Sequence, residues 1–572
     1  MIARPLAVVY LLLAAASARS QEVRARKPNI VLIISDDLGY GDLSSYGAPD
    51  ARTPNIDVLA KRGVRFTDSY ASGATCSATR AALMTGRYQQ RVGLEWALGP
   101  AWNPLDTVHG LPVTDASYPK LLKAQGYSTA LIGKWHLGET KPVRPNAHGF
   151  DYFWGFLGGA DDYYSHRDMW NREDLYENET PVHVPDYLTD AITQQAMKFI
   201  GDHANELFFV EVAYNATHWP FEPPGDSAAA KRDAPAHWDT PSDSSPRSRS
   251  DYIKMLERMD RGVGEIMRLL EARGLTHNTL VIFTNDNGGE WLSRNAPFFH
   301  RKGTLWEGGI RVPLILSWPA RLPAGRVSRQ LAITMDVTTT MLAAAGAVPA
   351  PGLPLDGLDL LPIAAGKKAV VERDLFWRIN IPGRIEHAVR SGPWKLIVEG
   401  ENARDGMHQL LFNLDTDPSE HRDLAAQNTA RVRELRGRIA TWEQDVHESR
   451  YGRDVAASIM ALAKTVPVDS VMAVYRSYKA APPRTYDMNE GILNSLGYWY
   501  LGNKRAPEAL KVLQLNAAEY PASWNSYDSL AEALLAVGDT TRAIENYRQS
   551  IRLNPNNANA VATLKRLGVS PH

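Results

Sequence analysis

Residues 29–37 read NIVLIISDD, an apolar run that ends in two carboxylates. Continuous runs of this kind, rich in β-branched residues, suit strands that are buried on both faces of a sheet. Three more runs follow along the chain: TALIG at 129–133, LFFVEVAY at 207–214 and TLVIFT at 279–284. These segments predict the central strands of one large sheet.

Helical patterns lie between these strands. In TPNIDVLAKRG, residues 53–63, Thr53 can cap a helix, Pro54 fits its first turn and Gly63 can end it. Alternating strands and helices predict an α/β domain with a largely parallel sheet covered by helices. In such a domain ligands bind outside the carboxyl ends of the strands.

Oxygen-bearing side chains follow two of the predicted strands. Asp36 and Asp37 come directly after the first strand, and Asp286 and Asn287 come after the last. Three carboxylates and an amide brought together would repel one another unless a cation lay among them, and an all-oxygen set suits calcium or magnesium. Each cluster alone also fits turn chemistry, because Asp and Asn are common after strands. The two together favour a metal site.

Cys76 is the only cysteine of the chain and opens the segment CSATRAALMTGR. The segment predicts a helix whose first turn holds the cysteine, where unpaired backbone N–H groups favour anions. Arg80, four residues later, falls on the same helical face. Two interpretations stay open from this segment alone, a buried free cysteine and a site that handles an oxyanion.

Further cationic side chains stand at loop positions. Lys134 and His136 lie two residues apart in GKWHLG, so an extended backbone would point both to the same side. His218 follows the third strand, and Lys302 lies beside a glycine. Each of these is a weak signal because such residues are often simply solvated. With Arg80 they could surround a multiply charged anion, and a histidine could give a proton to a leaving oxygen.

Composition and targeting signals narrow the setting. The chain has 572 residues, 44% of them hydrophobic, and a formal charge of −1, which disfavours a general nucleic-acid or membrane-surface binder. The first twenty residues, MIARPLAVVYLLLAAASARS, have the layout of a secretory signal peptide. We therefore expect a protein that is exported to the periplasm or secreted, with no membrane span after signal removal.

The chain resembles the type I sulfatases of the alkaline phosphatase superfamily, and within them the arylsulfatase B-like branch. The resemblance covers roughly residues 27–450 and rests on seven segments in the family's order: KPNIVLIISDDLGYGDLSSYG, TPNIDVLAKRGVRFTDSYA, CSATRAALMTGRY, GKWHLG, THWPF, FTNDNGG and RKGTLWEGGIRVP. It implies an α/β fold with an alkaline-phosphatase-like large mixed sheet flanked by helices. The implied domains are a catalytic domain at 21–365 and a small antiparallel-sheet subdomain at 366–450.

The resemblance also implies a mechanism. Cys76 would be oxidised by a formylglycine-generating enzyme, and the hydrated aldehyde would attack sulfur to form a formylglycine-sulfate intermediate. The implied ligands of a calcium ion, with magnesium as the alternative, are Asp36, Asp37, Asp286, Asn287 and the modified residue 76. Arg80, Lys134 and Lys302 would bind sulfate charge, His136 would act on the second hydroxyl of the hydrate, and His218 would protonate the leaving oxygen, a role that Lys302 could share.

Two features bear on maturation and substrate. Ala78 and Thr79 stand where many members of the family have proline and serine, which bears on recognition by the maturation enzyme. The expected substrate is a sulfated glycan or an aryl sulfate. Five residues lie in stretches that commonly shape the substrate pocket of such enzymes, and all five fit ordinary loop roles at least as well: Asp161, Asp162, His166, Trp291 and Arg294.

The last segment, residues 451–572, lies outside this resemblance and contains an internal repeat. The pairs Leu496 and Leu530, and Ala509 and Ala543, are each 34 residues apart, the period of tetratricopeptide helical hairpins. Stacked helical hairpins bury their faces against neighbours. We therefore expect a helical repeat region that either binds a protein partner or mediates self-association.

Two other functions remain open from the sequence. The first is a non-catalytic protein in which the repeats bind a partner and the sulfatase-like domain is a relic, although no metal ligand is missing. The second is a phosphoester hydrolase of the same superfamily, which would more naturally have serine or threonine at position 76.

Overall fold

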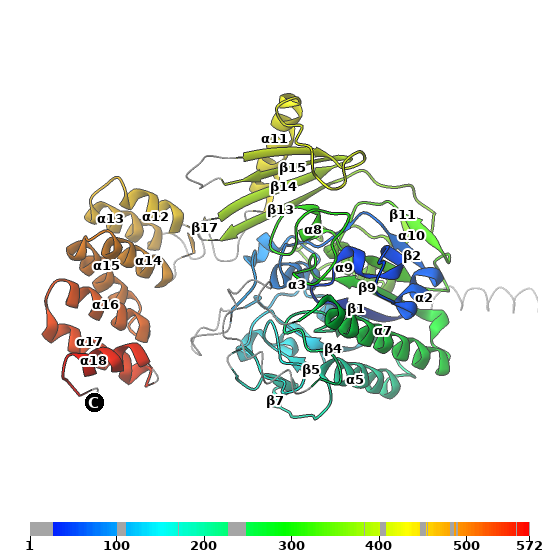
Figure 1. The fold of residues 1–572 in the computed structure, drawn as a ribbon, viewed down its shortest axis with the longest axis horizontal. Helices are drawn as coiled ribbons and strands as arrows, with labels where there is room; N and C mark the ends of the chain where they lie inside the picture. The colour runs from blue at the N-terminus through cyan, green and yellow to red at the C-terminus, as the bar shows by residue number, and fades with distance from the viewer. Residues whose placement is uncertain are drawn as a thin grey trace, which may run out of the picture. The chain divides into compact units, whose positions relative to one another are not determined.

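The computed structural model describes residues 27–99, 110–169, 171–226, 247–381, 384–400, 408–446, 453–454, 456–480, 486–487, 490–555 and 557–570. The chain divides into two compact units, Met1–Val446 and His447–His572 (Figure 1). The expected signal peptide, residues 1–20, lies outside the described residues. Within the described parts of the chain, no helix has both the length and the apolar character needed to span a membrane.

A ten-stranded mixed sheet forms the centre of the first unit, in the order β11-β2-β10-β9-β1-β8-β4-β5-β6-β7. Its middle strands are parallel and include all four predicted runs: β9 (Thr279–Asn285), β1 (Asn29–Ser35), β8 (Phe208–Ala213) and β4 (Ser128–Lys134), followed by β5 (Tyr152–Phe156). Every residue of β1 and β9 is buried. The predicted fold class is confirmed.

The outer strands make the sheet mixed. Strand β10 (Leu314–Ser317) runs antiparallel to both β9 and β2 (Val64–Phe66). Strand β11 (Arg326–Ser328) pairs in parallel with β2 and is the edge strand on that side. At the other edge, β6 (Leu175–Glu177) pairs antiparallel with β5 and with β7 (Thr180–Pro181). A separate pair joins β3 (Ser69–Tyr70) and β12 (Ala332–Ile333).

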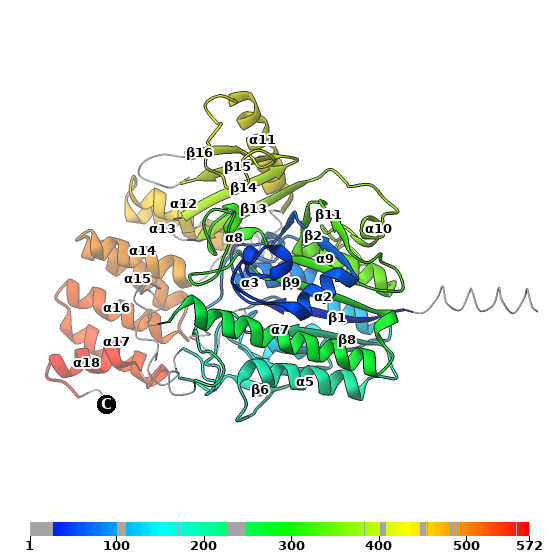
Figure 2. The ribbon, with the colours of Figure 1, turned by 45° about the vertical axis from the view of Figure 1, so that its right-hand side comes forward.

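Helices cover both faces of the large sheet. Val31 and Ile33 of β1 belong to the core under α2 (Pro54–Arg62), α5 (Leu188–Asp202) and α7 (Arg249–Ala272), which Figure 2 shows along one face. Ile30, Leu32 and Ile34 belong to the core under α3 (Cys76–Thr85), α4 (Tyr118–Lys123) and α9 (Thr334–Ala345). Alternate β1 residues therefore serve opposite faces, as the pleat requires.

The helix predicted around 53–63 forms as α2, with Thr53 at its N-cap and Gly63 at its C-cap. The Thr53 side chain does not cap the helix, however. Its hydroxyl instead accepts a hydrogen bond from the backbone N–H of Ser44, at 3.0 Å. The sequence correctly predicted that Thr53 stands at the N-cap. It did not predict the hydrogen bond of the Thr53 side chain correctly, because a neighbouring loop competes for the hydroxyl.

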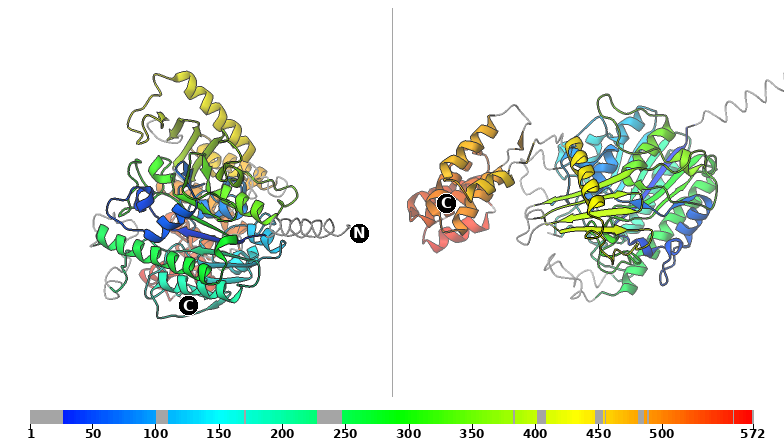
Figure 3. Two further views of the ribbon diagram at one scale, coloured as in Figure 1. Left: turned by 90° about the vertical axis from the view of Figure 1, so that its right-hand side faces the viewer. Right: turned by 90° about the horizontal axis from the view of Figure 1, so that it is seen from above.

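A small antiparallel sheet follows in the same unit. It contains β13 (Asp374–Ile381), β14 (Arg384–Ser391), β15 (Trp394–Glu399) and β16 (His408–Asn413), in that order. Helix α11 (Thr429–Val446) packs on it through Val432, Leu435 and Ile439, and Figure 3 shows the helix crossing the strands. Two one-turn helices, α8 (Glu307–Ile310) and α10 (Leu361–Ala364), precede this sheet in the chain.

Buried charges join the small sheet to the large one. The ammonium of Lys395, on β15, lies 3.0 Å from a Glu307 carboxylate oxygen on α8 and 2.8 Å from one of Glu420. All three side chains are buried. Glu307 also pairs with Arg311, at 2.9 Å, which leads into β10 of the large sheet. A lysine buried between two carboxylates therefore ties the two sheets together.

The second unit is helical. Its helices are α12 (Ala456–Ala463), α13 (Val468–Lys479), α14 (Glu490–Gly502), α15 (Ala506–Glu519), α16 (Trp524–Ala536), α17 (Thr540–Leu553) and α18 (Ala558–Arg566). Two short strands, β17 (Arg453–Asp454) and β18 (Tyr486–Asp487), pair in parallel. Helix α14 packs on α15, and α16 on α17. The four repeat positions, Leu496, Leu530, Ala509 and Ala543, are buried.

We expect Lys395→Met to destabilise the first unit strongly. The substitution keeps the length of the side chain but leaves Glu307 and Glu420 buried without their counter-charge, which costs about 3 kcal/mol or more. Chemical denaturation measures the free energy of unfolding. The matched control is Lys254→Met, because Lys254 is half exposed and its pair with Asp251 contributes less than about 1 kcal/mol. Equal losses for both variants would contradict the role given to the buried pair.

Candidate active site

Cys76 is the first residue of α3, as the sequence predicts. Its side chain is 1% exposed, and its sulfur lies 3.7 Å from a carboxylate oxygen of Asp36. Arg80, one turn later, donates two hydrogen bonds to the same oxygen of Asp286, at 3.0 and 3.1 Å, and a third to the Lys134 carbonyl. The arginine is thus held rigidly beside residue 76.

Pairing of β1 with β9 brings the two oxygen clusters together. The strands are parallel and in register from Asn29 to Ser35, so both end at the same edge of the sheet. The Asn287 amide donates to a carboxylate oxygen of Asp37 at 2.7 Å, and the backbone N–H of Asp37 lies 3.5 Å from an Asp286 oxygen. Asp37 has a φ of 57°, a left-handed conformation that Asp tolerates better than most residues.

Two lysines and a histidine reach the same carboxylates from other segments. The Lys134 ammonium, at the end of β4, lies 2.6 Å from Asp36. The Lys302 ammonium lies 2.8 Å from Asp37 and 3.2 Å from Nε2 of His218. The same His218 nitrogen is 3.4 Å from Asp37. The structure thus assembles these predicted residues in one buried site.

His136 reaches the site by a different route from the one predicted. Strand β4 ends at Lys134, and His136 has a φ of 55°, so the expectation of an extended backbone through both residues is wrong. Its Nε2 lies 2.9 Å from the Leu98 carbonyl, so we assign the proton to Nε2. Its Nδ1 is buried and has no hydrogen-bond partner within the described part of the chain. A Cβ at residue 159 would lie 2.7 Å from the ring, so glycine is needed there.

The cluster fits a metal ion. Ligand atoms of Asp36, Asp37, Cys76 and His218 lie within 4.8 Å of one another. The Asn287 side-chain oxygen is buried and has no hydrogen-bond partner among the described residues. Burial and the charge of Asp286 raise the pKa of Asp36 well above its usual value. Buried carboxylates and an unpaired amide oxygen are what a cation of the calcium or magnesium type requires.

The buried environment makes the cysteine unreactive as a thiol. Burial raises the pKa of Cys76 to about 12, even though Lys134 and Lys302 act in the opposite direction. A thiol with that pKa stays protonated at neutral pH, and it is the thiolate that attacks or ligates. The Cys76 thiol is therefore a poor nucleophile and a poor metal ligand at this position.

His218 is held as a neutral ring. Burial, together with the charges of Lys302 and Lys134, lowers its pKa to about 3, although Asp37 acts in the opposite direction. Its Nδ1–H donates a hydrogen bond to the carbonyl oxygen of Trp219. Nε2 is then left as an acceptor, facing the ammonium of Lys302.

A cavity of about 470 Å³ opens at this centre. Thr75, next to the cysteine, and Lys302 line it, together with three indoles, Trp96, Trp219 and Trp291. Trp291 was among the predicted pocket candidates. Trp96 and Arg384, which also line the cavity, carry no signal in the sequence. Trp219 and Arg301 could have been found, because each stands beside a motif residue.

The other pocket candidates are not among the residues that line this cavity. The Asp162 carboxylate accepts hydrogen bonds from the backbone N–H groups of Tyr164 and Ser165, as in an ordinary turn. Asp161 is buried, and the buried ring of His166 bonds to the Asp186 carbonyl. Arg294 contributes its backbone N–H to Asp42.

Two family models match overlapping parts of the first unit. The family model described as sulfatase matches residues 28–347, and the model described as N-sulphoglucosamine sulphohydrolase, C-terminal, matches residues 296–445. N-acetylgalactosamine-6-sulfatase of Canis lupus familiaris is 36% identical over 373 residues, 61% of this chain and 68% of that protein. Arylsulfatase A of Homo sapiens is 33% identical over 453 residues, 70% of this chain and 84% of that protein.

Solved structures agree with these matches. The crystal structure of Ps i-CgsB in complex with k-i-k-neocarrahexaose superposes with a TM-score of 0.66 at 32% identity, covering 74% of this chain and 94% of that one. The PsFucS1 sulfatase from Pseudoalteromonas sp. superposes with a TM-score of 0.59 at 26% identity, covering 78% and 96%. The chain therefore belongs to the type I, alkaline phosphatase-like sulfatase family, a family of sulfuric ester hydrolases.

Proposed function

We propose that the protein hydrolyses a sulfate ester of a glycan or a phenol to the alcohol and inorganic sulfate. One observation carries this proposal: the Cys76 sulfur stands at a helix start, 3.7 Å from an Asp36 oxygen, in the field of the buried cation Lys134 and the partly buried cation Lys302. A buried site with fixed positive charge suits an anionic group that gains charge as it transfers. The names of the relatives, N-acetylgalactosamine-6-sulfatase and arylsulfatase A, support sulfate as that group.

Residue 76 acts after conversion to formylglycine by a formylglycine-generating enzyme. The raised pKa of the thiol supports this assignment, because a protonated thiol is a poor nucleophile. Its hydrated aldehyde supplies the oxygen that attacks sulfur and carries the sulfate as an ester. Ala78 and Thr79 are both buried in α3, so the maturation enzyme must read this segment before folding is complete.

Asp36, Asp37, Asp286, Asn287 and residue 76 would hold a calcium ion, with magnesium as the second candidate. When bound, the ion lowers the pKa of the attacking hydroxyl and neutralises sulfate charge. The Asn287 side-chain oxygen, which has no partner in the part of the chain that the structure describes, and the three buried carboxylates support this ligand set.

The fixed cations bind the sulfate. Lys134 and Lys302 are each held by a carboxylate at 2.6 and 2.8 Å, and Arg80 by two hydrogen bonds to Asp286. Side chains that are already held need no reorganisation when charge develops on the sulfate oxygens. Their positions thus favour the transition state over the ground state.

The two histidines divide the proton transfers. His136 donates from Nε2 to the Leu98 carbonyl, and its Nδ1, which has no partner among the described residues, would take a proton from the second hydroxyl of the hydrate. We propose that His218 and Lys302 together protonate the leaving oxygen, rather than His218 alone. A neutral His218 that accepts from Lys302 orients the ammonium, and the ammonium is the donor.

Further assignments are proposals of the same kind. The catalytic domain spans 21–365, the small subdomain 366–450 and the repeat region 451–572, in an exported protein of the arylsulfatase B-like branch. Helices α14 and α15 pack together, as do α16 and α17, and the corresponding helices of the two pairs begin 34 residues apart. This supports tetratricopeptide-like repeats that bind a protein partner or a second copy.

Conversion of Cys76 should create the activity. Co-expression with a formylglycine-generating enzyme should give the mass decrease expected when the thiol is replaced by an aldehyde, together with release of sulfate from an aryl sulfate in calcium buffer. Cys76→Ala, the control, should show neither. Conversion without sulfate release from any aryl or glycan sulfate would refute the proposed function, and faster cleavage of phosphate esters would favour a phosphoester hydrolase.

Lys302→Met should lower kcat/KM by about 100-fold or more, because it removes both sulfate binding and the proposed proton donor. The loss should be greater for a sugar sulfate, whose leaving oxygen needs a proton, than for 4-nitrophenyl sulfate, whose 4-nitrophenolate group leaves without one. His218→Gln should show the same leaving-group dependence with a smaller loss. Lys254→Met is the control. A loss of equal size for both leaving groups would rule out proton donation by Lys302.

Removal of metal should abolish activity and lower the melting temperature, because the carboxylates of Asp36, Asp37 and Asp286 are buried beside one another. Chelation followed by calorimetry measures both effects, and titration with calcium and then magnesium identifies the ion that restores them. Asp286→Asn should require more calcium for half-maximal activity. An active protein with an unchanged melting temperature after chelation would contradict the metal site.

A further inference from the structure

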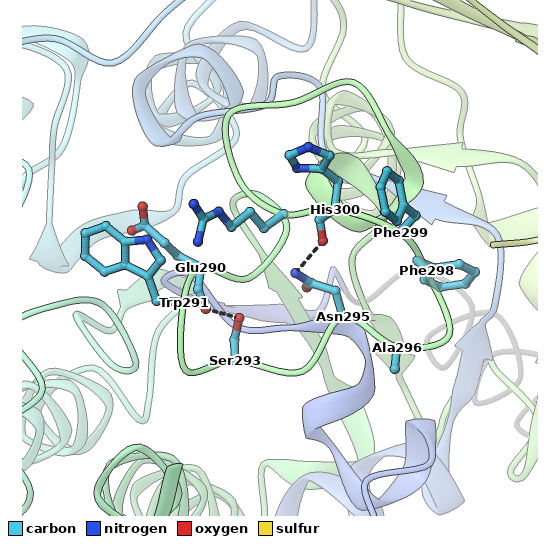
Figure 4. A pocket seen from close by; sticks show the side chains of 9 residues that line it. Glu290, Trp291, Ser293, Asn295, Ala296, Phe298, Phe299 and His300 are labelled. Atoms are coloured by element: carbon cyan, nitrogen blue, oxygen red, sulfur yellow. Dashed lines mark hydrogen bonds between the residues drawn. The ribbon is translucent and has the colours of Figure 1, made fainter. Parts of the chain in front are cut away.

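The cavity at the reaction centre continues into a second hollow. That hollow has a volume of about 380 Å³ and shares Glu290, Trp291, His300 and Arg301 with the first. We call the two together the 290–304 groove. Figure 4 shows Trp291 and Glu290 on one side of the second hollow and Phe298 and Phe299 on the other, with His300 between them. Pockets of about 300–1,000 Å³ each take a drug-sized ligand, so the groove has room for more than one sugar ring.

The walls of the groove suit sugar rings. Trp96, Trp219 and Trp291 line the end nearest the reaction centre, and Phe299, 43% exposed, lines the far end. Aromatic faces that combine a large apolar area with restricted rotation stack well on flat, weakly polar ring faces. The Thr75 hydroxyl, buried in the wall beside Cys76, has no hydrogen-bond partner within the described residues.

One cation of the groove forms no ion pair with any residue that the structure describes. Lys302 is shared by Asp37 and, at 3.8 Å, by Glu290. Arg384 pairs with both oxygens of Glu386, at 2.6 and 2.8 Å, and lies 5.9 Å from the Trp96 ring. Arg301, in contrast, is exposed, and its guanidinium has no hydrogen bond or ion pair among the residues that the structure describes.

The unpaired arginine lies where the two hollows meet. Arg301 lines both of them, and burial together with the charges of Arg301 and Arg384 lowers the pKa of the intervening His300. His300 therefore stays neutral and adds no competing charge. A free guanidinium presents paired N–H donors that match a carboxylate or a sulfate better than they match neutral hydroxyl groups.

We propose that the 290–304 groove binds a sulfated oligosaccharide that carries a second anionic group on the sugar next to the ester being cleaved, and that Arg301 is the residue that selects this group. The second anion is a sulfate or a carboxylate, since both have the oxygen geometry that a guanidinium binds. This inference rests on the proposed sulfatase function and narrows its substrate from sulfated phenols to anionic glycans. Arg301 binds the substrate and takes no part in bond cleavage.

Calorimetric binding to the Cys76→Ala protein tests the subsite without turnover. The probes are sulfated oligosaccharides of equal length with one sulfate, with two sulfates, and with one sulfate and one carboxylate. The doubly charged probes should bind about tenfold more tightly than the singly charged one, a difference of about 1.4 kcal/mol. The difference in affinity between the doubly and singly charged probes should decrease as salt is added, because Arg301 is exposed. The two doubly charged probes show which anion the subsite prefers.

Adding Arg301→Gln should remove this preference, and adding Arg301→Lys should restore only part of it, because lysine keeps the charge but loses the paired donors. Arg52→Gln, at an exposed site elsewhere in this unit, is the matched control and should keep the preference. Equal melting temperatures establish that the variants fold. A preference unchanged by Arg301→Gln, or absent from the parent protein, would overturn the subsite.

Activity distinguishes failure of the subsite from failure of the proposed function. In the converted enzyme, the ratio of kcat/KM for doubly over singly charged substrates should fall about tenfold in Arg301→Gln. A protein that discriminates in binding yet releases no sulfate would retain the subsite and refute the sulfatase proposal. A protein that releases sulfate from all three glycans at equal kcat/KM would retain the sulfatase and refute the subsite.

Discussion

The parallel pairing of β1 with β9 is the constraint on which the site depends. Because the two strands are in register up to Ser35 and Asn285, the residues that follow them emerge side by side at one edge of the sheet. This places the carboxylates of Asp36, Asp37 and Asp286 in one buried volume. Such a cluster is stable only with compensating positive charge, and the arrangement of the surrounding segments follows from that need.

The cations that compensate it come from three separate parts of the chain. Arg80 arrives on α3 and holds Asp286, Lys134 ends β4 and holds Asp36, and Lys302 arrives on a loop and holds Asp37. Each ion pair fixes the cation as well as the carboxylate. The same contacts that make the buried charges tolerable therefore preorganise a positively charged site around residue 76, and stability and chemistry share one set of interactions.

Much of the site could be predicted from local patterns. The apolar runs identify β1, β4, β8 and β9, because a strand buried on both faces has few polar residues to interrupt it. The position of Cys76 at a helix start was also predicted correctly. The predicted backbone conformation at His136 was wrong, because the prediction assumed a strand that continues past Lys134. Trp96 and Arg384 could not be found at all, since they meet in the groove only after the small sheet docks on the large one.

The sequence by itself determined the strands, the start of α3 and the types of residue that the chemistry needs, because backbone periodicity and side-chain chemistry are local properties. Only the tertiary structure decided which carboxylate each cation holds, and that, among the described residues, Nδ1 of His136 and the guanidinium of Arg301 have no partner. The reason is physical. Charge compensation and cavity shape depend on distances between segments up to a few hundred residues apart, and those distances are set by packing rather than by neighbours in the chain.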